Sequence, residues 1–175
     1  MIRTALSAIG VKGNGMALVD MFLKLDGVNG ESEDPEHKAE IQLDGFRLNL
    51  VSPRDSFTNQ ASGARRWSHL SIRAKIDMST PLLFLKLATN AKIPTAILTC
   101  RKAGKVQFQY FKITLSEVLV VKVEAGELEA SGASVIPHCD FDLAFGKIEI
   151  LGSPQTSTGP TSGTVSMQDD LRLNR

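Results

Sequence analysis

Alternating apolar and polar residues run through much of this chain and predict a protein built mainly of β-strands. Residues 19–25 set the pattern, and on their polar face Phe22 is the single apolar residue. A period of two places one face of a strand on a core and most of the other in water. The same alternation returns in residues 70–76 and 138–145. We therefore expect four buried strand residues in particular, namely Leu23, Ile72, Phe141 and Leu143.

A sharp acidic turn follows the first strand, and a second strand follows the turn. Asp26-Gly27 and Asn29-Gly30 supply the residue types that tolerate positive φ where a chain must turn. In the second strand the apolar phase then changes, since Leu43 precedes Gly45 on one face and Phe46 follows it on the other. A glycine at a change of phase predicts a β-bulge at Gly45.

Other strands also change phase, which favours a closed structure over a flat sheet. A strand over residues 106–123 would exceed about 50 Å if straight, at roughly 3.3 Å per residue, so it must bend or break. Its apolar phase shifts between Tyr110 and Phe111, where we place the bend, and another strand changes phase around Gly146. We predict a mainly β fold: a small closed β-barrel of two packed antiparallel sheets, with one short helix and a long protruding loop.

The one predicted helix starts at Ser79-Thr80-Pro81 and runs to about Thr89-Asn90. Hydroxyl residues followed by proline are typical of a helix start, with the proline at the first helical position. Apolar residues lie nearly all round this helix, which is unusual for a helix on the surface of a monomer. We expect a neighbouring subunit to cover part of it, with these inter-subunit candidates: Leu82, Leu83, Phe84, Leu85 and Leu87.

Three regions fall outside the strand and helix patterns. Residues 52–67 are polar and aperiodic, which predicts a long protruding loop of the kind that is usually functional or disordered. Residues 152–175 are rich in Ser, Thr, Gly and Pro and predict a flexible tail. In residues 1–15 the short apolar stretch from Ala5 to Val11 is interrupted by Ser7 and Gly10 and lacks a proper small-residue cleavage site. We therefore interpret residues 1–15 as an N-terminal extension, or a start codon assigned too early, and not as a secretory signal. The barrel domain then spans residues 16–151.

Length, composition and charge indicate a single globular domain and give no sign of a membrane span or of bulk binding to nucleic acid. The chain has 175 residues, 42% of them hydrophobic, which suits one domain with a real core. Its 20 basic and 19 acidic residues balance to +1, which gives no reason to expect bulk binding to nucleic acid or to anionic lipid. No apolar run reaches the roughly 18 residues of a membrane span, so no membrane insertion is expected. Cys100 and Cys139 sit in predicted strands, where two buried thiols are expected and a disulfide is the alternative.

The candidate chemistry is sparse. His37 lies in an acidic stretch, but the spacing fits neither an EF-hand nor a zinc signature, so a solvated turn is the simpler interpretation and a metal site the alternative. His69 and His138 fall on polar strand faces. Neither a catalytic grouping nor a phosphate-binding glycine pattern is visible, although a spatial triad can be hidden in sequence. We expect no metal, no cofactor and no catalytic residues.

The cluster Arg65-Arg66-Trp67 is the one place where basic and aromatic residues meet. It resembles the nucleic-acid contacts of oligonucleotide-binding barrels, but a single cluster in a nearly neutral chain is weak support for that function. Packing of Trp67 that anchors the loop is a second interpretation. We favour a protein contact, because Arg and Trp are enriched at the centres of interfaces.

Four stretches resemble the Hcp family, the tube proteins of the bacterial type VI secretion system. The first is D-G-V-N-G-E-S in residues 26–32, followed by acidic residues and H-K-A-E-I. The others are an I-D-x-S-T-P stretch that begins at Ile76, C-R-K-A-G over residues 100–104, and Y-F-K-I-T-L-S-E-V-L-V over residues 110–120. The matches occur in order along roughly residues 16–150. The chain departs from the family pattern in its tail, which lacks an expected tryptophan-bearing strand, and in a 52–67 loop that is not glycine- and serine-rich.

The resemblance implies a structural protein and not an enzyme. Members of the family form homohexameric rings that stack into a tube, which a contractile sheath expels. The implied partners are copies of the same chain, the spike protein and sheath of the secretion system, and small effectors in the ring lumen. The implied location is the bacterial cytoplasm, followed by secretion without a signal peptide.

Within such an assembly we expect the 52–67 loop to contact the adjacent ring. A mix of opposite charges and aromatic anchors suits a head-to-tail contact between unlike surfaces. The inter-ring candidates are Asp55, Phe57, Arg65, Arg66 and Trp67. The alternative functions are an oligonucleotide-binding barrel and an enzyme with an unrecognised polar site.

Overall fold

The computed structural model describes residues 19–102, 107–126, 136–156, 159–160 and 163–173. The proposed N-terminal extension, residues 1–15, lies outside the described residues. The first half of the chain contains β1 (Val19–Leu25), β2 (Ile41–Arg47), β3 (Leu50–Val51), β4 (Arg66–Trp67), β5 (Leu70–Lys75) and α1 (Ser79–Ala88). The second half contains β6 (Ile93–Lys102), β7 (Phe108–Gly126), β8 (His138–Ala144), β9 (Lys147–Gly152), β10 (Gln155–Thr156), β11 (Gly159–Pro160) and β12 (Val165–Asp170).

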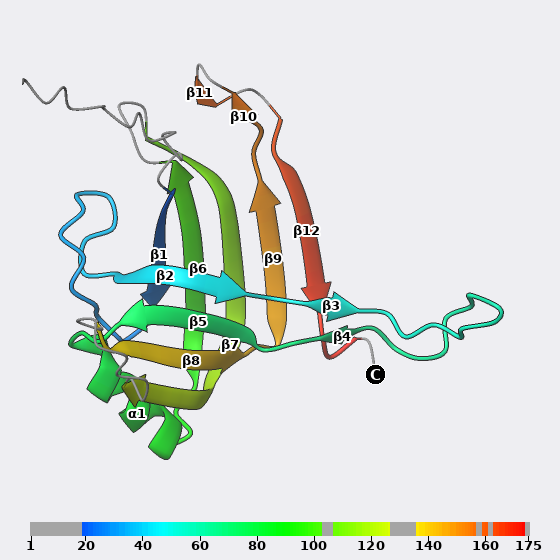
Figure 1. The fold of residues 1–175 in the computed structure, drawn as a ribbon, viewed down its shortest axis with the longest axis horizontal. Helices are drawn as coiled ribbons and strands as arrows, with labels where there is room; N and C mark the ends of the chain where they lie inside the picture. The colour runs from blue at the N-terminus through cyan, green and yellow to red at the C-terminus, as the bar shows by residue number, and fades with distance from the viewer. Residues whose placement is uncertain (1–18, 103–106, 127–135, 157–158, 161–162, 174–175) are drawn as a thin grey trace, which may run out of the picture.

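Six strands close into an antiparallel barrel, as the sequence predicts. They are hydrogen-bonded in the order β7-β6-β1-β2-β5-β8, and β8 pairs again with β7 to complete the circuit. Strands β9 and β12 continue the sheet beyond β7 and lie outside this circuit. The barrel therefore carries a two-stranded flange on one side (Figure 1).

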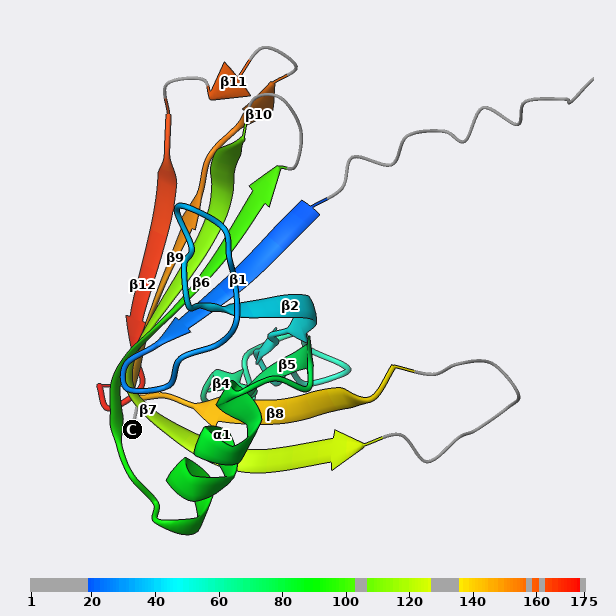
Figure 2. The same cartoon turned by 90° about the vertical axis from the view of Figure 1, so that its left-hand side faces the viewer.

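The barrel walls are two sheets that cross one another and share β7. Figures 1 and 2 show β1, β6, β9 and β12 lying roughly along one axis, in alternating directions, while β2, β5 and β8 cross them. Crossing at a large angle is one of the two ways in which sheets pack, and it needs strands that pass from one sheet to the other. Strand β7 does so, because its first part pairs with β6 and β9 and its last part pairs with β8.

The corner of β7 lies at Glu117, a position that the sequence did not reveal. Its φ is +57°, in the left-handed region, and the pairing of β7 moves from β6 to β8 just after it. The predicted phase shift at Tyr110 is real but has another cause, since Cys100 pairs with Phe111 and Arg101 with Gln109, which leaves Tyr110 as a bulge. The prediction of a bend was thus right and its position was wrong.

The predicted core and the predicted bulge at Gly45 are both confirmed. The pairing of β2 with β5 shifts between Leu43 and Gly45. Inside the barrel the four residues expected to be buried are at most 3% exposed: Leu23, Ile72, Phe141 and Leu143. Helix α1 packs against β7 and contributes Leu83, which is fully buried.

The start of α1 differs from the prediction. The helix begins at Ser79, which places Pro81 at the third helical residue, and Met78 at the cap position makes no side-chain capping bond. The carboxylate of Asp77 accepts the Ser79 backbone N–H at 2.9 Å, while the hydroxyl of Thr80 accepts the Asp77 N–H at 3.3 Å. A carboxylate does the work expected of the hydroxyls because it is the stronger acceptor and also suits the positive end of the helix dipole.

Part of the expected flexible tail is a strand. Residues 165–170 form β12, which pairs with all of β9 from Lys147 to Gly152. The sequence pattern did not predict this strand, because most of its side chains are exposed and Val165 is 76% exposed. A strand without a buried face has no alternation of apolar and polar residues. The prediction of a tail without structure is therefore wrong for these residues.

Candidate assembly surfaces

The predicted protruding loop is an ordered arm that projects away from the barrel. We use the word arm for residues 50–67, which comprise β3, a turn and β4 (Figure 1). Leu50 pairs with Trp67 and Val51 with Arg66, and farther out Arg54 bridges Ala61. The sequence showed no period here because both faces of the arm are exposed to solvent, so neither selects apolar residues.

Asp55 and Phe57 form the turn at the end of the arm. One oxygen of the Asp55 carboxylate accepts the backbone N–H groups of Phe57 at 3.0 Å and of Thr58 at 2.8 Å. The Thr58 bonds are the main reason why the pKa of Asp55 lies below its usual value. This turn presents Phe57 with 98% of its surface exposed. A phenyl ring held in full contact with water is a candidate contact for a partner.

Trp67 and Arg65 lie at the base of the arm, away from its tip. The indole N–H of Trp67 donates to the Asp169 carboxylate at 2.9 Å, and its ring packs edge-on against Phe145 with centroids 6.2 Å apart. A guanidinium nitrogen of Arg65 lies 3.9 Å from the same carboxylate. Thus Trp67 anchors the arm, which was the second interpretation of this cluster. An indole packed in this way is not a free platform for stacking a nucleobase.

The five predicted inter-ring residues therefore separate into groups. Asp55 and Phe57 lie at the tip, while Arg65 and Trp67 contact the C-terminal strand at the base. Arg66 is exposed on β4. If the arm contacts a partner, the tip is the part placed to do so.

Helix α1 presents a second apolar surface. Of the five residues expected at a subunit contact, Leu83 is buried in the core, and Leu82 and Leu87 pack partly against it. Phe84 is 44% exposed and Leu85 is 57% exposed. The sequence therefore predicted correctly that the barrel leaves part of this helix uncovered.

The acidic turn between β1 and β2 is a closed loop, residues 26–40, fastened at both ends. Gly30 donates to the Ala39 carbonyl at 2.9 Å, and a side chain at Gly30 would come within 2.5 Å of the Glu40 carbonyl oxygen. Glu31 accepts the backbone N–H of Met78 at 3.0 Å, next to the start of α1. Two residues of the G-E-S motif thus have structural roles, one in closing the loop and one in joining it to the helix.

Arg101 fastens the same loop to the barrel wall, a role that sequence analysis missed. Its side chain, 4% exposed, reaches Asp34 with two guanidinium nitrogens, one of them at 3.0 Å. It also donates to Asp20 on β1 at 3.2 Å. The hydrogen bond from Arg101 is the main cause that lowers the pKa of Asp34 to about 2. Arg101 follows the buried Cys100 and so lies on the opposite, outer face of β6, where the loop that folds over this face buries it.

Phe22 is the apolar residue on that outer face, and the loop also covers it. The ring of His37 stacks on Phe22 with centroids 4.3 Å apart, and the Arg101 guanidinium carbon lies 5.1 Å from the Phe22 centroid. The Nδ1 atom of His37 lies 2.8 Å from the Glu40 carboxylate. Here His37 is a packing residue, and among the described residues no group of three or more His, Cys, Asp or Glu is arranged to hold a metal ion.

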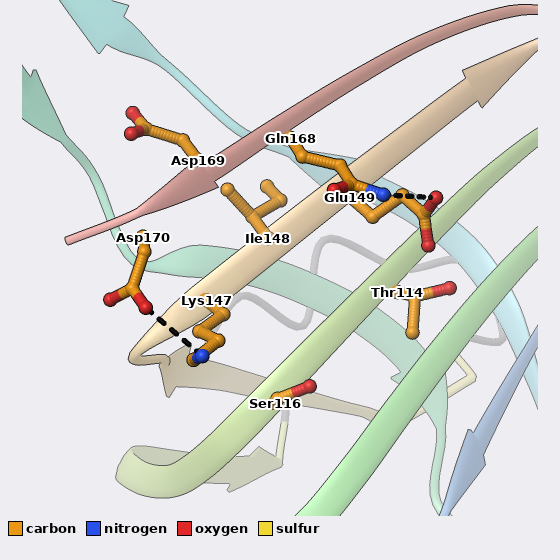
Figure 3. Close-up of a pocket in the computed structure, with 8 residues that line it drawn as sticks. All are labelled: Thr114, Ser116, Lys147, Ile148, Glu149, Gln168, Asp169 and Asp170. Atoms are coloured by element: carbon orange, nitrogen blue, oxygen red, sulfur yellow. Dashed lines mark hydrogen bonds and ion pairs between the residues drawn. The ribbon is translucent and has the colours of Figure 1, made fainter.

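The flange carries a polar groove of about 310 Å³ across β7, β9 and β12. Lys147 pairs with Asp170 at 3.0 Å, and Gln168 donates to Glu149 at 2.8 Å (Figure 3). Ion pairs to Lys147 and Arg172 hold the pKa of Asp170 well below its usual value, with the Arg172 bond the larger cause. The two pairs join β12 to β9 by side-chain contacts, in addition to the backbone ladder.

Both cysteines are free thiols buried in the barrel. Burial raises the pKa of Cys100 to about 11, and it also raises the pKa of Cys139. Within the described part of the chain, no helix has the length and apolar character needed to cross a bilayer.

Comparison with known proteins identifies the family. The profile described as "Type VI secretion system effector, Hcp" matches residues 22–151. Protein hcp1 of Pseudomonas aeruginosa is 34% identical over 148 residues, which cover 83% of this chain and 90% of that protein.

Solved structures agree with the fold. The crystal structure of Hcp1 from Salmonella typhimurium is 29% identical, covers 91% of this chain and 99% of its own, and superposes with a TM-score of 0.71. A structure described as a type six secretion system protein covers 90% of this chain and 99% of its own with a TM-score of 0.81, but at 22% identity it supports the fold alone. Since the profile spans most of the barrel and a relative above 30% identity covers most of the chain, the chain belongs to the Hcp family of type VI secretion system tube proteins.

Proposed function

We propose that this chain is the subunit of a secreted tube: it forms a homohexameric ring, and the rings stack head to tail. The observation that carries the proposal is that one small barrel presents two separate apolar surfaces, the exposed side of α1 and the tip of the arm. A tube needs two kinds of contact, one that closes a ring and one that repeats along the axis. Membership of the family supports the same conclusion.

Helix α1 is the proposed contact within the ring. Phe84 and Leu85 are more than 40% exposed on an ordered helix whose buried side is fixed in the core by Leu83. An apolar surface on a rigid element loses little conformational entropy when a neighbour covers it. Full burial of a side chain of this size contributes about 1.5–3 kcal/mol, so covering the exposed half of each contributes about half of that. Repetition of such a contact around a closed ring gives a stable hexamer.

The arm is the proposed contact between rings. It projects from the barrel, so it reaches beyond the body of its own subunit, and its turn carries Phe57. A tip that inserts into a different surface of the next subunit makes a heterologous contact, and such contacts propagate along an axis. The remaining roles follow from a tube: expulsion by a contractile sheath, contact with a spike protein at its end, and transport of small effectors in the lumen.

A pair of variants separates the two contacts. Leu85→Glu places a charge in the proposed ring interface, so native mass spectrometry should show a shift from hexamer to monomer. Ile136→Glu is the matched control, because Ile136 is 56% exposed, almost the same as Leu85. The ring proposal fails if Leu85→Glu assembles as well as the control.

Phe57→Ala addresses stacking. It should leave hexamers intact, remove the tubes seen by negative-stain electron microscopy and lower secretion into the medium. Leu173→Ala, another truncation of a highly exposed apolar residue, is its control and should stack normally. Tubes of normal length from Phe57→Ala would exclude the tip as the axial contact.

A further inference from the structure

Asp169 on β12 joins two segments that lie far apart in the sequence. Its carboxylate receives the indole N–H of Trp67 across 102 residues of chain and also lies 3.9 Å from Arg65. We infer that Asp169 is a positioning residue, which holds the arm at the angle needed for ring stacking. This inference rests on the proposed axial role of the arm.

Among the described residues, the backbone hydrogen bonds at the base of the arm run between its own two sides. Its own ladder at the base consists of the pairs Leu50–Trp67 and Val51–Arg66, and the Ser68 N–H donates to the Asn49 carbonyl at 2.8 Å. These bonds join the two sides of the arm to each other and do not join the arm to the barrel. A two-stranded ribbon outside a larger sheet is marginally stable by itself and free to swing at its base.

Trp67 supplies the connection to the molecule. The indole and the Phe145 ring form an edge-to-face contact next to the turn between β8 and β9, and the indole N–H donates to Asp169. Packing alone permits sliding, whereas a hydrogen bond to a charged acceptor fixes direction and is about twice as strong as a neutral one. The pair therefore sets the orientation of the arm.

The anchor itself is firmly held. Strand β12 pairs with β9 along its whole length, and its end is tied by Lys147–Asp170 at 3.0 Å and Arg172–Glu117 at 2.8 Å. Figure 3 shows the Asp169 carboxylate directed away from the Lys147–Asp170 pair. Successive side chains of a strand point to opposite faces, so Gln168 and Asp170 contact β9 while Asp169 contacts the arm.

Hydrogen exchange tests the positioning role directly. In Asp169→Ala, the amides of residues 50–51 and 66–68 should exchange about tenfold faster than in the parent, as expected when a bond to a charged group is lost. Trp67 is the only tryptophan in the chain, so its fluorescence should also shift to longer wavelength and become easier to quench. Asp169→Asn keeps an oxygen acceptor for the indole and should restore most of the protection.

Gln168→Ala is the matched control. It removes the neighbouring bond from β12 to Glu149 and leaves the arm contact in place, so exchange in the arm should not change. Trp67→Phe gives a second route to the same loss, because it keeps an aromatic ring against Phe145 and removes the N–H. Equal exchange of the arm amides in Asp169→Ala and Gln168→Ala would overturn the inference.

Tube assembly then separates this inference from the proposed function. The inference holds if Asp169→Ala frees the arm, keeps hexamers and shortens or removes tubes, while Asp169→Asn restores them. It is overturned if the arm is freed and tubes are normal. In that case Phe57→Ala tests whether the arm makes the axial contact at all. Loss of tubes in Phe57→Ala would support the axial role of the arm, and normal tubes would exclude it.

Discussion

At the scale of single residues, one glycine and one arginine hold the acidic loop against the barrel. Gly30 permits the two sides of the loop to approach to hydrogen-bonding distance, and Arg101 is buried beneath the loop with Asp34 and Asp20 as its partners. A buried guanidinium needs its partners, because an uncompensated charge in such a place is costly. Substitution of Gly30 should therefore lower the free energy of unfolding, and substitution at the Arg101–Asp34 pair should also change how that free energy depends on pH.

Gly30→Ala should destabilise the protein strongly. The new Cβ would lie 2.5 Å from the Glu40 carbonyl oxygen, which is backbone and cannot move aside without opening the loop. We expect a loss of about 2 kcal/mol or more in the free energy of unfolding measured with urea, within the range of overpacked sites. Gly152→Ala is the control, since nothing lies within 4 Å of the added atom. Equal stability of the two variants would show that the loop closes differently.

Asp34→Asn should reduce the loss of stability in acid. The folded pKa of Asp34 is about 2, below its ordinary value of 3.8, so its contribution is complete above about pH 4 and disappears as the pH falls toward 2. The variant lacks this titration, so its unfolding free energy should fall less steeply between pH 4 and 2. At neutral pH it should be less stable by about 2 kcal/mol, the amount that a shift of this size supplies, because Arg101 loses one of its charged partners and keeps Asp20.

Lys38→Gln, a change on the exposed side of the same loop, is the control for Asp34→Asn. It should retain the acid dependence of the parent. An unchanged slope in Asp34→Asn would mean that the Arg101 pair does not persist in solution.

The two thiols should react only after unfolding. Cys100, with a pKa near 11, and Cys139 are both buried, so few thiolates form at pH 8 and reagents cannot reach them. Titration with a disulfide reagent should find two groups in guanidinium chloride and almost none in the native protein. Fast native reaction, or no reaction after unfolding without reductant, would contradict this arrangement.

At the scale of elements, the alternation of apolar and polar residues predicted the strands that have one buried face. The strands of the barrel have one buried face and so show a period of two, and the bulge at Gly45 shows as a change of phase. The corner at Glu117 did not show, because a non-glycine residue at positive φ gives no sequence signal. Strand β12 and the burial of Arg101 depend on partners elsewhere in the chain, which alternation cannot reveal.

Of the two candidate surfaces, one was predictable from local sequence and the other depended on distant parts of the chain. The exposed side of α1 was predictable, because apolar residues all round a short helix exceed what one barrel can cover. The roles within the arm were not, since the separation of Phe57 from Trp67 depends on Asp169, 102 residues beyond Trp67.

Leu143→Ala tests the barrel wall at β8. Leu143 is fully buried and pairs with Leu70 on β5 and Val120 on β7, so truncation leaves a cavity where three strands meet. We expect a loss of about 2–5 kcal/mol in the free energy of unfolding. Leu173→Ala, at a residue 83% exposed, should change stability by less than about 0.5 kcal/mol. A small effect at Leu143 would show that β8 is not part of the closed wall.

At the scale of the whole molecule, closure of the barrel separates what is essential for folding from what is attached. The six-strand circuit is complete without β12, which among the described strands pairs with β9 alone. Removal of the segment after Ser153 should therefore leave a folded barrel with the far-ultraviolet circular dichroism of a β protein. Exchange of the arm amides should rise, since Asp169 is gone. Cooperative unfolding lost altogether in this truncation would mean that the flange is part of the folding unit.

The late position of β8 in the chain bears on how the protein is made. Strands β5 and β7 both need β8 as a neighbour, so until His138–Ala144 has left the ribosome each keeps an edge of unpaired amides and carbonyls. Pairings between distant segments also place this barrel among slow folders, which complete folding in milliseconds to seconds. The nascent chain thus passes through a stage in which two strand edges are unpaired and can pair with other chains. We therefore expect the protein to aggregate when it is overproduced rapidly, and to aggregate less at low temperature.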